Sequence, residues 1–219
     1  MNSTQLLLFI PTALLLAIAP GPDNLGVLVL GLSAGRRASL GFALGCAAGC
    51  LNHTLLAVFG VSALIAASPT AFHLLQWAGA AYLAWIGWQS WRQSFRRTSS
   101  PDSTIDQEQR FLPHFRRGLI ANAINPKVAL FFLAFLPQFV RADGWIVPAQ
   151  LAVLGALFAL ISALVFSGLA AGAGKVGAWL ALRPRAFPVL QRLTGFLFIG
   201  LALRLALADV APPPSQLPA

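Results

Sequence analysis

The stretch Ala19-Pro20-Gly21-Pro22-Asp23-Asn24 interrupts the first long apolar run of the 219-residue chain. Apart from Asp23, no charged side chain occurs before Arg36. Two prolines and a glycine remove backbone donors and disrupt helical geometry, so a continuous helix is expected to stop here. A carboxylate at this depth costs about 2.5–3.5 kcal/mol on membrane-insertion scales. The sequence therefore predicts a membrane helix that is broken near its middle, with an acid at the break.

The composition is that of an integral membrane protein. Apolar residues make up 58% of the chain and charged residues only 10%, whereas about a quarter of a soluble domain is charged. No positively charged segment precedes the first apolar run, so we expect no cleaved signal peptide. The net charge of +9 could indicate nucleic-acid binding, but the positions of the basic residues, described below, favour a role in membrane topology.

Six apolar runs are each near the roughly 20 residues that a helix needs to cross a bilayer. They cover residues 6–32, 40–67, 72–91, 119–140, 147–173 and 187–208. The sixth is the weakest, because only eleven uncharged residues separate Arg192 from Arg204; both side chains can snorkel to opposite interfaces. We predict an all-α protein with six transmembrane helices.

The basic residues set the orientation. Three of the regions between spans, with the start of the sixth span, hold twelve of the fifteen lysines and arginines. These twelve are Arg36, Arg37, Arg92, Arg96, Arg97, Arg110, Arg116, Arg117, Lys175, Arg183, Arg185 and Arg192. On the opposite side the loops hold only Arg141. Because positive loops face the cytoplasm, both termini are predicted to be periplasmic, and no nucleic-acid partner is expected.

The chain divides into two halves of three spans. Residues 1–93 form the first three-helix repeat, 94–114 a polar cytoplasmic linker, 115–210 the second repeat and 211–219 a proline-rich tail. Since three is an odd number, the second half enters the membrane from the opposite face, which is an inverted-topology repeat. Pro22-Asp23 recurs as Pro126-Lys127 at an offset of 104 residues, so helices 1 and 4 are both predicted to be broken.

The charges at the two breaks have opposite signs. Asn125 is expected to cap the second half-helix of span four, with Pro126 at its first position. Lys127 then lies in the first turn, where the helix dipole disfavours a cation. On a structural interpretation, Asp23 pairs with Lys127 and holds the repeats together. On a functional one, helix amides and Lys127 attract a carboxylate while Asp23 receives an ammonium group or a proton, which suits an amino acid.

Several motifs resemble one protein family. They are Ala19-Pro20-Gly21-Pro22-Asp23-Asn24, Gly35-Arg36-Arg37 with Gly41-Phe42-Ala43-Leu44-Gly45, Gly79-Ala80-Ala81-Tyr82-Leu83-Ala84-Trp85-Ile86-Gly87, and Phe115-Arg116-Arg117-Gly118-Leu119-Ile120-Ala121-Asn122-Ala123-Ile124-Asn125-Pro126-Lys127. In order and spacing they resemble the LysE/RhtB-type amino-acid exporters, over residues 5–208. The resemblance implies a carrier of the bacterial inner membrane that exports amino acids or related metabolites against proton entry.

Breaks and motifs together predict a substrate site. Its expected residues are Pro20, Gly21, Pro22, Asp23, Asn24, Asn122, Asn125, Pro126 and Lys127. Asp23 and His53 are the candidates for proton coupling. We expect no cofactor and no enzymatic activity, because the chain has no Ser/His/Asp set, phosphate-binding loop or paired carboxylates. The substrate's identity and homo-oligomerisation stay open.

The second span carries a stripe of small residues. Gly41, Gly45, Gly49 and His53 recur every four residues, a spacing that allows close helix–helix approach. The alternative takes Cys46, Cys50 and His53 as metal ligands or a thiol pair, and the protein as a membrane thiol-redox or metal-handling protein. His53 is either a hydrogen-bonded packing residue or part of a proton relay.

The topology can be tested with reporter fusions. A reporter fused after Pro101 is expected to report the cytoplasm, and one after Ala211 the periplasm, because the positive loops mark the inner face. Alkaline phosphatase and green fluorescent protein activities in intact cells make the measurement. Both reporters on the same side would contradict an odd number of spans in each half.

Overall fold

The computed structural model describes residues 3–95, 110–141, 144–183 and 185–207, and every regular element in these ranges is helical. The elements are α1 (Ser3–Ile18), α2 (Pro22–Ser33), α3 (Arg36–Leu56), η1 (Ala57–Val61), α4 (Ser62–Ala67), α5 (Pro69–Gln93), α6 (Phe111–Ala123), α7 (Pro126–Leu130), η2 (Phe131–Phe135), η3 (Leu136–Phe139), α8 (Val147–Leu182) and α9 (Ala186–Leu207). The all-α prediction is confirmed. Most of the predicted linker and the proline-rich tail lie outside the described residues.

Several of these helices can cross a membrane. Among the described residues, Arg36–Leu64, Val147–Leu182 and Ala186–Leu207 are long and apolar enough, and two bent pairs bring the number of candidate spans to five. The helix α5, predicted as the third span, is not in this group. It carries polar side chains along its length, among them Gln76 and Gln89, which lower its mean hydropathy.

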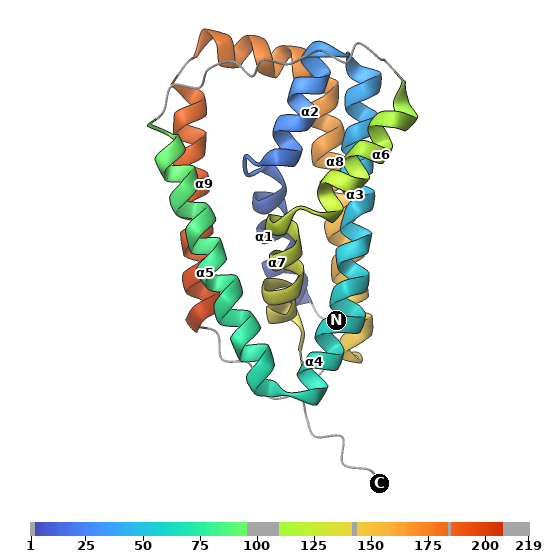
Figure 1. Ribbon diagram of the computed structural model, residues 1–219, viewed down its shortest axis with the longest axis vertical. Coiled ribbons are helices and arrows are strands. Elements are labelled where there is room, and N and C mark those ends of the chain that lie inside the picture. Colours follow the sequence, from blue (N-terminus) through green and yellow to red (C-terminus); the bar gives the residue numbers. More distant parts are fainter. Residues whose placement is uncertain (1–2, 96–109, 142–143, 184, 208–219) are drawn as a thin grey trace.

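Both predicted helix breaks are present. The axis bends by 51° between Ile18 and Pro22, and by 50° between Ala123 and Pro126. Pro22 and Pro126 each stand at the start of the second helix of their pair, where a missing amide hydrogen costs least. The pair α1–α2 and the pair α6–α7 run in opposite directions (Figure 1), as two inverted halves would.

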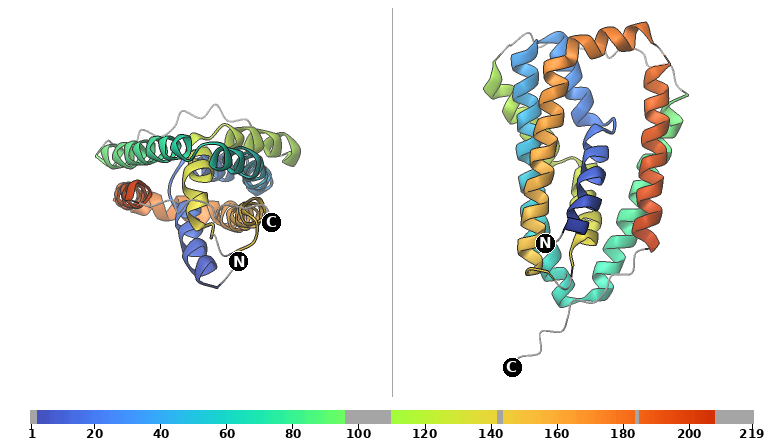
Figure 2. Two further views of the ribbon diagram at one scale, coloured as in Figure 1. Left: turned by 90° about the horizontal axis from the view of Figure 1, so that it is seen from below. Right: turned by 180° about the vertical axis from the view of Figure 1, so that it is seen from behind.

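The helices form two groups around the broken pairs. The helices α5 and α9 pack together, while α2, α3, α6 and α8 form a second group. The segments α1 and α7 lie between these groups (Figures 1 and 2). Phe131, Phe132 and Phe135, which follow α7, are almost fully buried. The second broken helix therefore supplies much of the central core.

Two helices extend beyond the predicted spans. The helix α6 begins at Phe111 rather than at residue 119, and α8 continues to Leu182 rather than ending at residue 173. Arg116, Arg117 and Lys175 end the apolar runs, but charged residues do not end a helix. The last turns of α8 lie across one end of the molecule and lead to α9 (Figure 2).

The glycine stripe brings α3 against α6. A Cβ atom added to Gly41 or Gly45 would collide with the carbonyl oxygen of Phe111 or Phe115, respectively. At Gly49 the added Cβ would lie 2.8 Å from the side chain of Asn122. The prediction that this stripe serves close helix packing is confirmed. The contact also fixes the end of α6 from which Asn122 projects.

The packing predicts a large effect from one methyl group. Gly45→Ala should destabilise the protein by about 1–3 kcal/mol, because the new Cβ has to push the α6 backbone away. Gly168→Ala is the matched control, since no described heavy atom lies within 4 Å of a Cβ at that position. Thermal unfolding of both purified variants in detergent measures the difference. Equal midpoints would contradict the close α3–α6 contact.

Candidate functional site

The break after α1 exposes carbonyl groups that no longer have partners within the helix. They belong to Leu16, Ala17, Ile18 and Ala19, and each accepts a hydrogen bond from a side chain. The Asn24 amide nitrogen, Nδ2, reaches Ala17 and Ile18 at 3.0 Å and Ala19 at 3.2 Å. Asn24 therefore folds the start of α2 back onto the end of α1.

Lys127 supplies the remaining donors from the other half of the chain. Its Nζ atom lies 3.1 Å from the carbonyl oxygen of Ala19 and 3.4 Å from that of Leu16. It also lies 5.0 Å from the centre of the Phe198 ring on α9. A Cβ atom on Gly21 would approach Nζ to 3.2 Å, so the glycine leaves room for the ammonium group. The negative end of the α1 dipole thus offsets the unfavourable position of Lys127 in α7.

Asp23 is held by two amides. Its side chain is 5% exposed. Its Oδ2 atom accepts from Nδ2 of Asn122 at 2.7 Å, and Oδ1 accepts from Nδ2 of Asn125 at 3.1 Å. Asn122 lies in the last turn of α6 and Asn125 in the break before α7, at sequence separations of 99 and 102 from Asp23. The first break is therefore closed by groups from the second.

Asn125 also caps α7, as predicted. Its Oδ1 atom accepts from the backbone nitrogen of Lys127 at 3.1 Å. Its carbonyl accepts from Val128 at 3.2 Å and from Ala129 at 3.0 Å. The first-turn amides of α7 are thus occupied, which differs from the expectation that they are free for a carboxylate. The Lys127 ammonium group is left as the positive group on this helix.

The two opposite charges are not paired with each other. Within the described residues, Asp23 binds neutral amides and Lys127 binds neutral carbonyls, in place of the direct ion pair of the structural interpretation. Neutral donors and acceptors satisfy the polar atoms, and Asp23 attracts Lys127 only from a distance. Within the described residues neither charge therefore has a counter-charge in direct contact, which is costly in a low dielectric. Both groups can therefore gain from a ligand of opposite charge.

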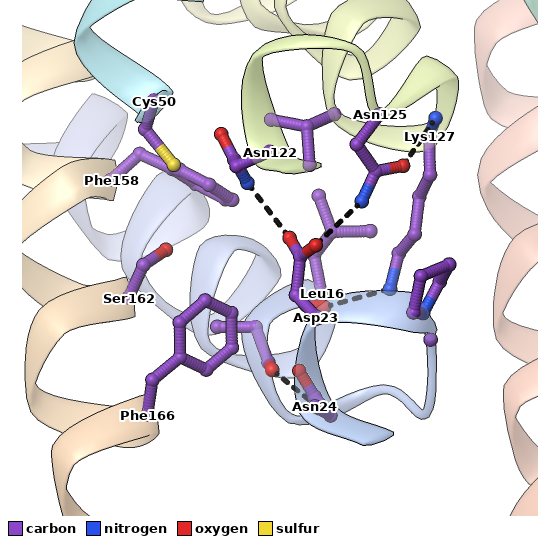
Figure 3. Close-up of a pocket in the computed structure, with 14 residues that line it drawn as sticks. Leu16, Asp23, Asn24, Cys50, Asn122, Asn125, Lys127, Phe158, Ser162 and Phe166 are labelled. Atoms are coloured by element: carbon purple, nitrogen blue, oxygen red, sulfur yellow. Dashed lines mark hydrogen bonds between the residues drawn. The ribbon is translucent and has the colours of Figure 1, made fainter. Parts of the chain in front are cut away.

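A small cavity lies between these groups (Figure 3). The volume that the centre of a water molecule can occupy inside it is about 20 Å³. The cavity therefore has room for one water-sized group. Seven of the nine predicted site residues line it: Gly21, Pro22, Asp23, Asn24, Asn122, Asn125 and Lys127. Pro20 and Pro126 are not among the lining residues; they shape the breaks instead.

The sequence did not assign the other lining residues to a substrate site, although it singled out Cys50 as a possible metal ligand or thiol. They are Leu16, Ala17, Cys50, Val128, Phe158, Ser162 and Phe166. In a membrane helix every face is apolar, so hydrophobicity does not separate a cavity wall from a lipid-facing surface. The spacing of Phe158, Ser162 and Phe166, each one turn after the last, was the available signal.

His53 contacts the site without lining it. It is 1% exposed, and its Nε2 atom lies 2.9 Å from the carbonyl oxygen of Asn122. Since a carbonyl only accepts, Nε2 carries the proton. Its Nδ1 atom is buried without a partner. His53 therefore has a definite packing role, and its place in a proton relay stays a prediction.

The cysteines do not form a metal site in the part of the chain that the structure describes. No group of three or more His, Cys, Asp or Glu side chains is arranged there to hold an ion. Cys46 and Cys50 are both free and buried. The Cys50 thiol donates to the carbonyl of Cys46 at 3.6 Å, as a packing residue in a helix can.

The carbonyl cap on α1 can be tested at Asn24. Asn24→Asp keeps the size but replaces the donor with a carboxylate that faces three carbonyl oxygens, so we expect a loss of about 1–3 kcal/mol or more. Ser33→Ala is the control: its hydroxyl bonds the Val29 carbonyl at 2.8 Å, and that carbonyl keeps its helical partner. Thermal unfolding in detergent compares the two. An Asn24→Asp variant as stable as Ser33→Ala would refute the cap.

Comparison with known proteins assigns the chain to a family. Residues 14–209 match the LysE type translocator family. The chain is 35% identical over 204 residues to an uncharacterized membrane protein of Vibrio cholerae, covering 92% of this chain and 96% of the relative. It is 30% identical over 200 residues to a homoserine/homoserine lactone efflux protein of Salmonella typhimurium, covering 91% and 95%.

A leucine efflux protein of Enterobacter sp. is 30% identical over 205 residues, which cover 90% of this chain and 93% of the relative. No solved structure matches. The family match covers both helix breaks and every residue that lines the cavity. The chain is therefore a membrane protein of the LysE type translocator family, as its motifs predicted.

Proposed function

We propose that this protein is a secondary transporter that exports amino acids or related small zwitterions across the bacterial inner membrane. The observation that carries the proposal is a pair of opposite charges, the buried Asp23 and the half-buried Lys127, which line one cavity without a direct ion pair between them. Relatives named for homoserine and leucine efflux support the substrate class. A zwitterion offers one opposite charge to each of these two groups.

Binding replaces internal contacts with substrate contacts. The substrate ammonium group binds Asp23 in place of the amide of Asn125, while Asn122 keeps its bond to Oδ2. The substrate carboxylate binds the Nζ atom of Lys127 and replaces the carbonyl groups at the end of α1. An ion pair in a dry site is stronger than a bond to a neutral group. The free space, sized for one water-sized group, is too small for an amino acid, so the helices around it must separate.

The proposed architecture gives this separation a direction. Six spans in two inverted three-helix repeats, residues 1–93 and 115–210, would rock against each other with the linker 94–114 in the cytoplasm. The opposite direction of the two broken pairs supports this arrangement (Figure 1). The amides and carbonyls that bind Asp23 and Lys127 join the two halves, so substrate that replaces them loosens the contact between the halves. Both termini are proposed to be periplasmic.

Proton entry is the proposed source of energy. A proton on Asp23 removes its charge and releases the substrate ammonium group, so proton and substrate compete for one carboxylate. His53 is the proposed second group, because it holds the carbonyl of Asn122, whose side chain binds Asp23. No observation favours the thiol-redox or metal-handling alternative.

Charge-removing substitutions test the proposed site. Asp23→Asn and Lys127→Met should each reduce amino-acid export to background, because one end of the zwitterion loses its partner. Lys175→Met is the control, since this exposed lysine lies outside the cavity. Export of a mixed amino-acid panel from loaded vesicles, with and without a proton gradient, makes the measurement. Immunoblots of the membrane fraction check that each variant inserts.

Full export by Asp23→Asn or by Lys127→Met would remove that residue from the site. Export that ignores the proton gradient would reject the coupling while leaving the carrier. Loss of export in Lys175→Met at normal membrane levels would attribute the effect to basic charge in general and not to the cavity.

A further inference from the structure

Ser162 has an unusual environment for a hydroxyl group in a membrane helix. Such hydroxyls commonly bond the carbonyl one turn earlier, and Thr12, Ser33 and Thr54 do so at 2.8, 2.8 and 2.9 Å. Ser162 is 1% exposed, and its Oγ atom is buried without a partner. It lines the cavity and lies across it from Asn122 (Figure 3).

Asn122 provides a second polar atom without a partner. Its Nδ2 atom donates to Asp23, and because a carboxylate only accepts, this contact fixes the orientation of the amide. The Oδ1 atom therefore faces away from Asp23, toward Cys50 (Figure 3), and is buried without a partner. One cavity thus holds a free acceptor from α6 and a free hydroxyl from α8. The Cys50 thiol lies beside both side chains and donates to the carbonyl of Cys46 in its own helix.

The wall around Ser162 is otherwise apolar. Phe158 and Phe166 lie one turn before and after it, are 3% and 5% exposed, and line the same cavity. A charged group here would lose its hydration without a counter-charge, since Asp23 and Lys127 are assigned to the substrate's ammonium and carboxylate groups. A neutral group is therefore favoured.

We propose that Ser162 and the Oδ1 atom of Asn122 form a side-chain subsite that selects amino acids carrying a hydroxyl group. This inference rests on the proposed function, because it assigns the third substituent of the same zwitterion. A hydroxyl group can donate to Oδ1 of Asn122 and accept from Oγ of Ser162 at once. A methyl group in its place leaves both protein atoms buried and unpaired, which is how sites of this kind reject an analogue.

Homoserine and norvaline form the matched pair for the test, because they differ only by a hydroxyl in place of a methyl group. Initial export rates of both, at low concentration, are measured with the full-length protein in proteoliposomes. We expect the wild type to favour homoserine by at least about tenfold. In Ser162→Ala the ratio should fall to about twofold or less, through a larger loss for homoserine than for norvaline.

Two further variants separate the hydroxyl from general damage. Ser162→Thr keeps a hydroxyl and should keep most of the preference. Ser62→Ala removes another buried hydroxyl without a partner that does not line this cavity, and should leave the ratio at its wild-type value. A similar fall of the ratio in Ser62→Ala would overturn the assignment to the cavity.

The remaining outcomes distinguish this inference from the proposed function. Equal export of homoserine and norvaline by the wild type would overturn the subsite and leave the amino-acid carrier intact. A strong preference that survives Ser162→Ala would remove Ser162 from recognition. Export of neither compound, nor of any other amino acid, by protein present in the liposomes would reject the carrier, and the subsite with it.

Discussion

Four carbonyl groups at the end of α1 impose the main physical constraint on this molecule. Inside a membrane no water is available to bind them, and each one left unpaired would cost several kcal/mol. Asn24 and Lys127 together supply the missing donors. One of these donors comes from the other half of the chain. The break in the first half is therefore stable only while the second half is packed against it.

At the second break, too, one side chain makes two contacts. Asn125 caps α7 with its oxygen and binds Asp23 with its nitrogen. A movement of Asp23 would therefore displace Asn125 and, with it, the start of α7. Because each charge is bound by groups that also complete a helix end, a ligand that takes either charge must change the contact between the broken helices. This link between binding and helix position is what a carrier requires.

The prolines made the positions of the two helix breaks predictable from the sequence. The hydrogen-bond partners that join the two breaks could not be predicted in this way. Pro22 and Pro126 fix where the second helices begin, and Asn125 before Pro126 is a recognisable cap. The bonds from Asn24 to α1 and from Asn122 to Asp23 depend on how the two breaks meet in space, which local pattern does not specify. Opposite charges at the breaks suggested an ion pair, whereas the backbone groups freed by the break compete for Lys127. Phe158, Ser162 and Phe166 lay in an apolar run in which lipid-facing and cavity-facing positions look alike.

The central claim is that one site binds both charged groups of a zwitterion. Competition by modified substrates tests this claim most directly. An exported amino acid would be compared with its amide, which lacks the carboxylate, and with its des-amino acid, which lacks the ammonium group. Each is added in excess to the export assay of the labelled amino acid. If Asp23 and Lys127 bind the two ends, only the complete zwitterion should compete strongly, because each analogue leaves one of these two charges without its ligand. Equal competition by either analogue would contradict the account.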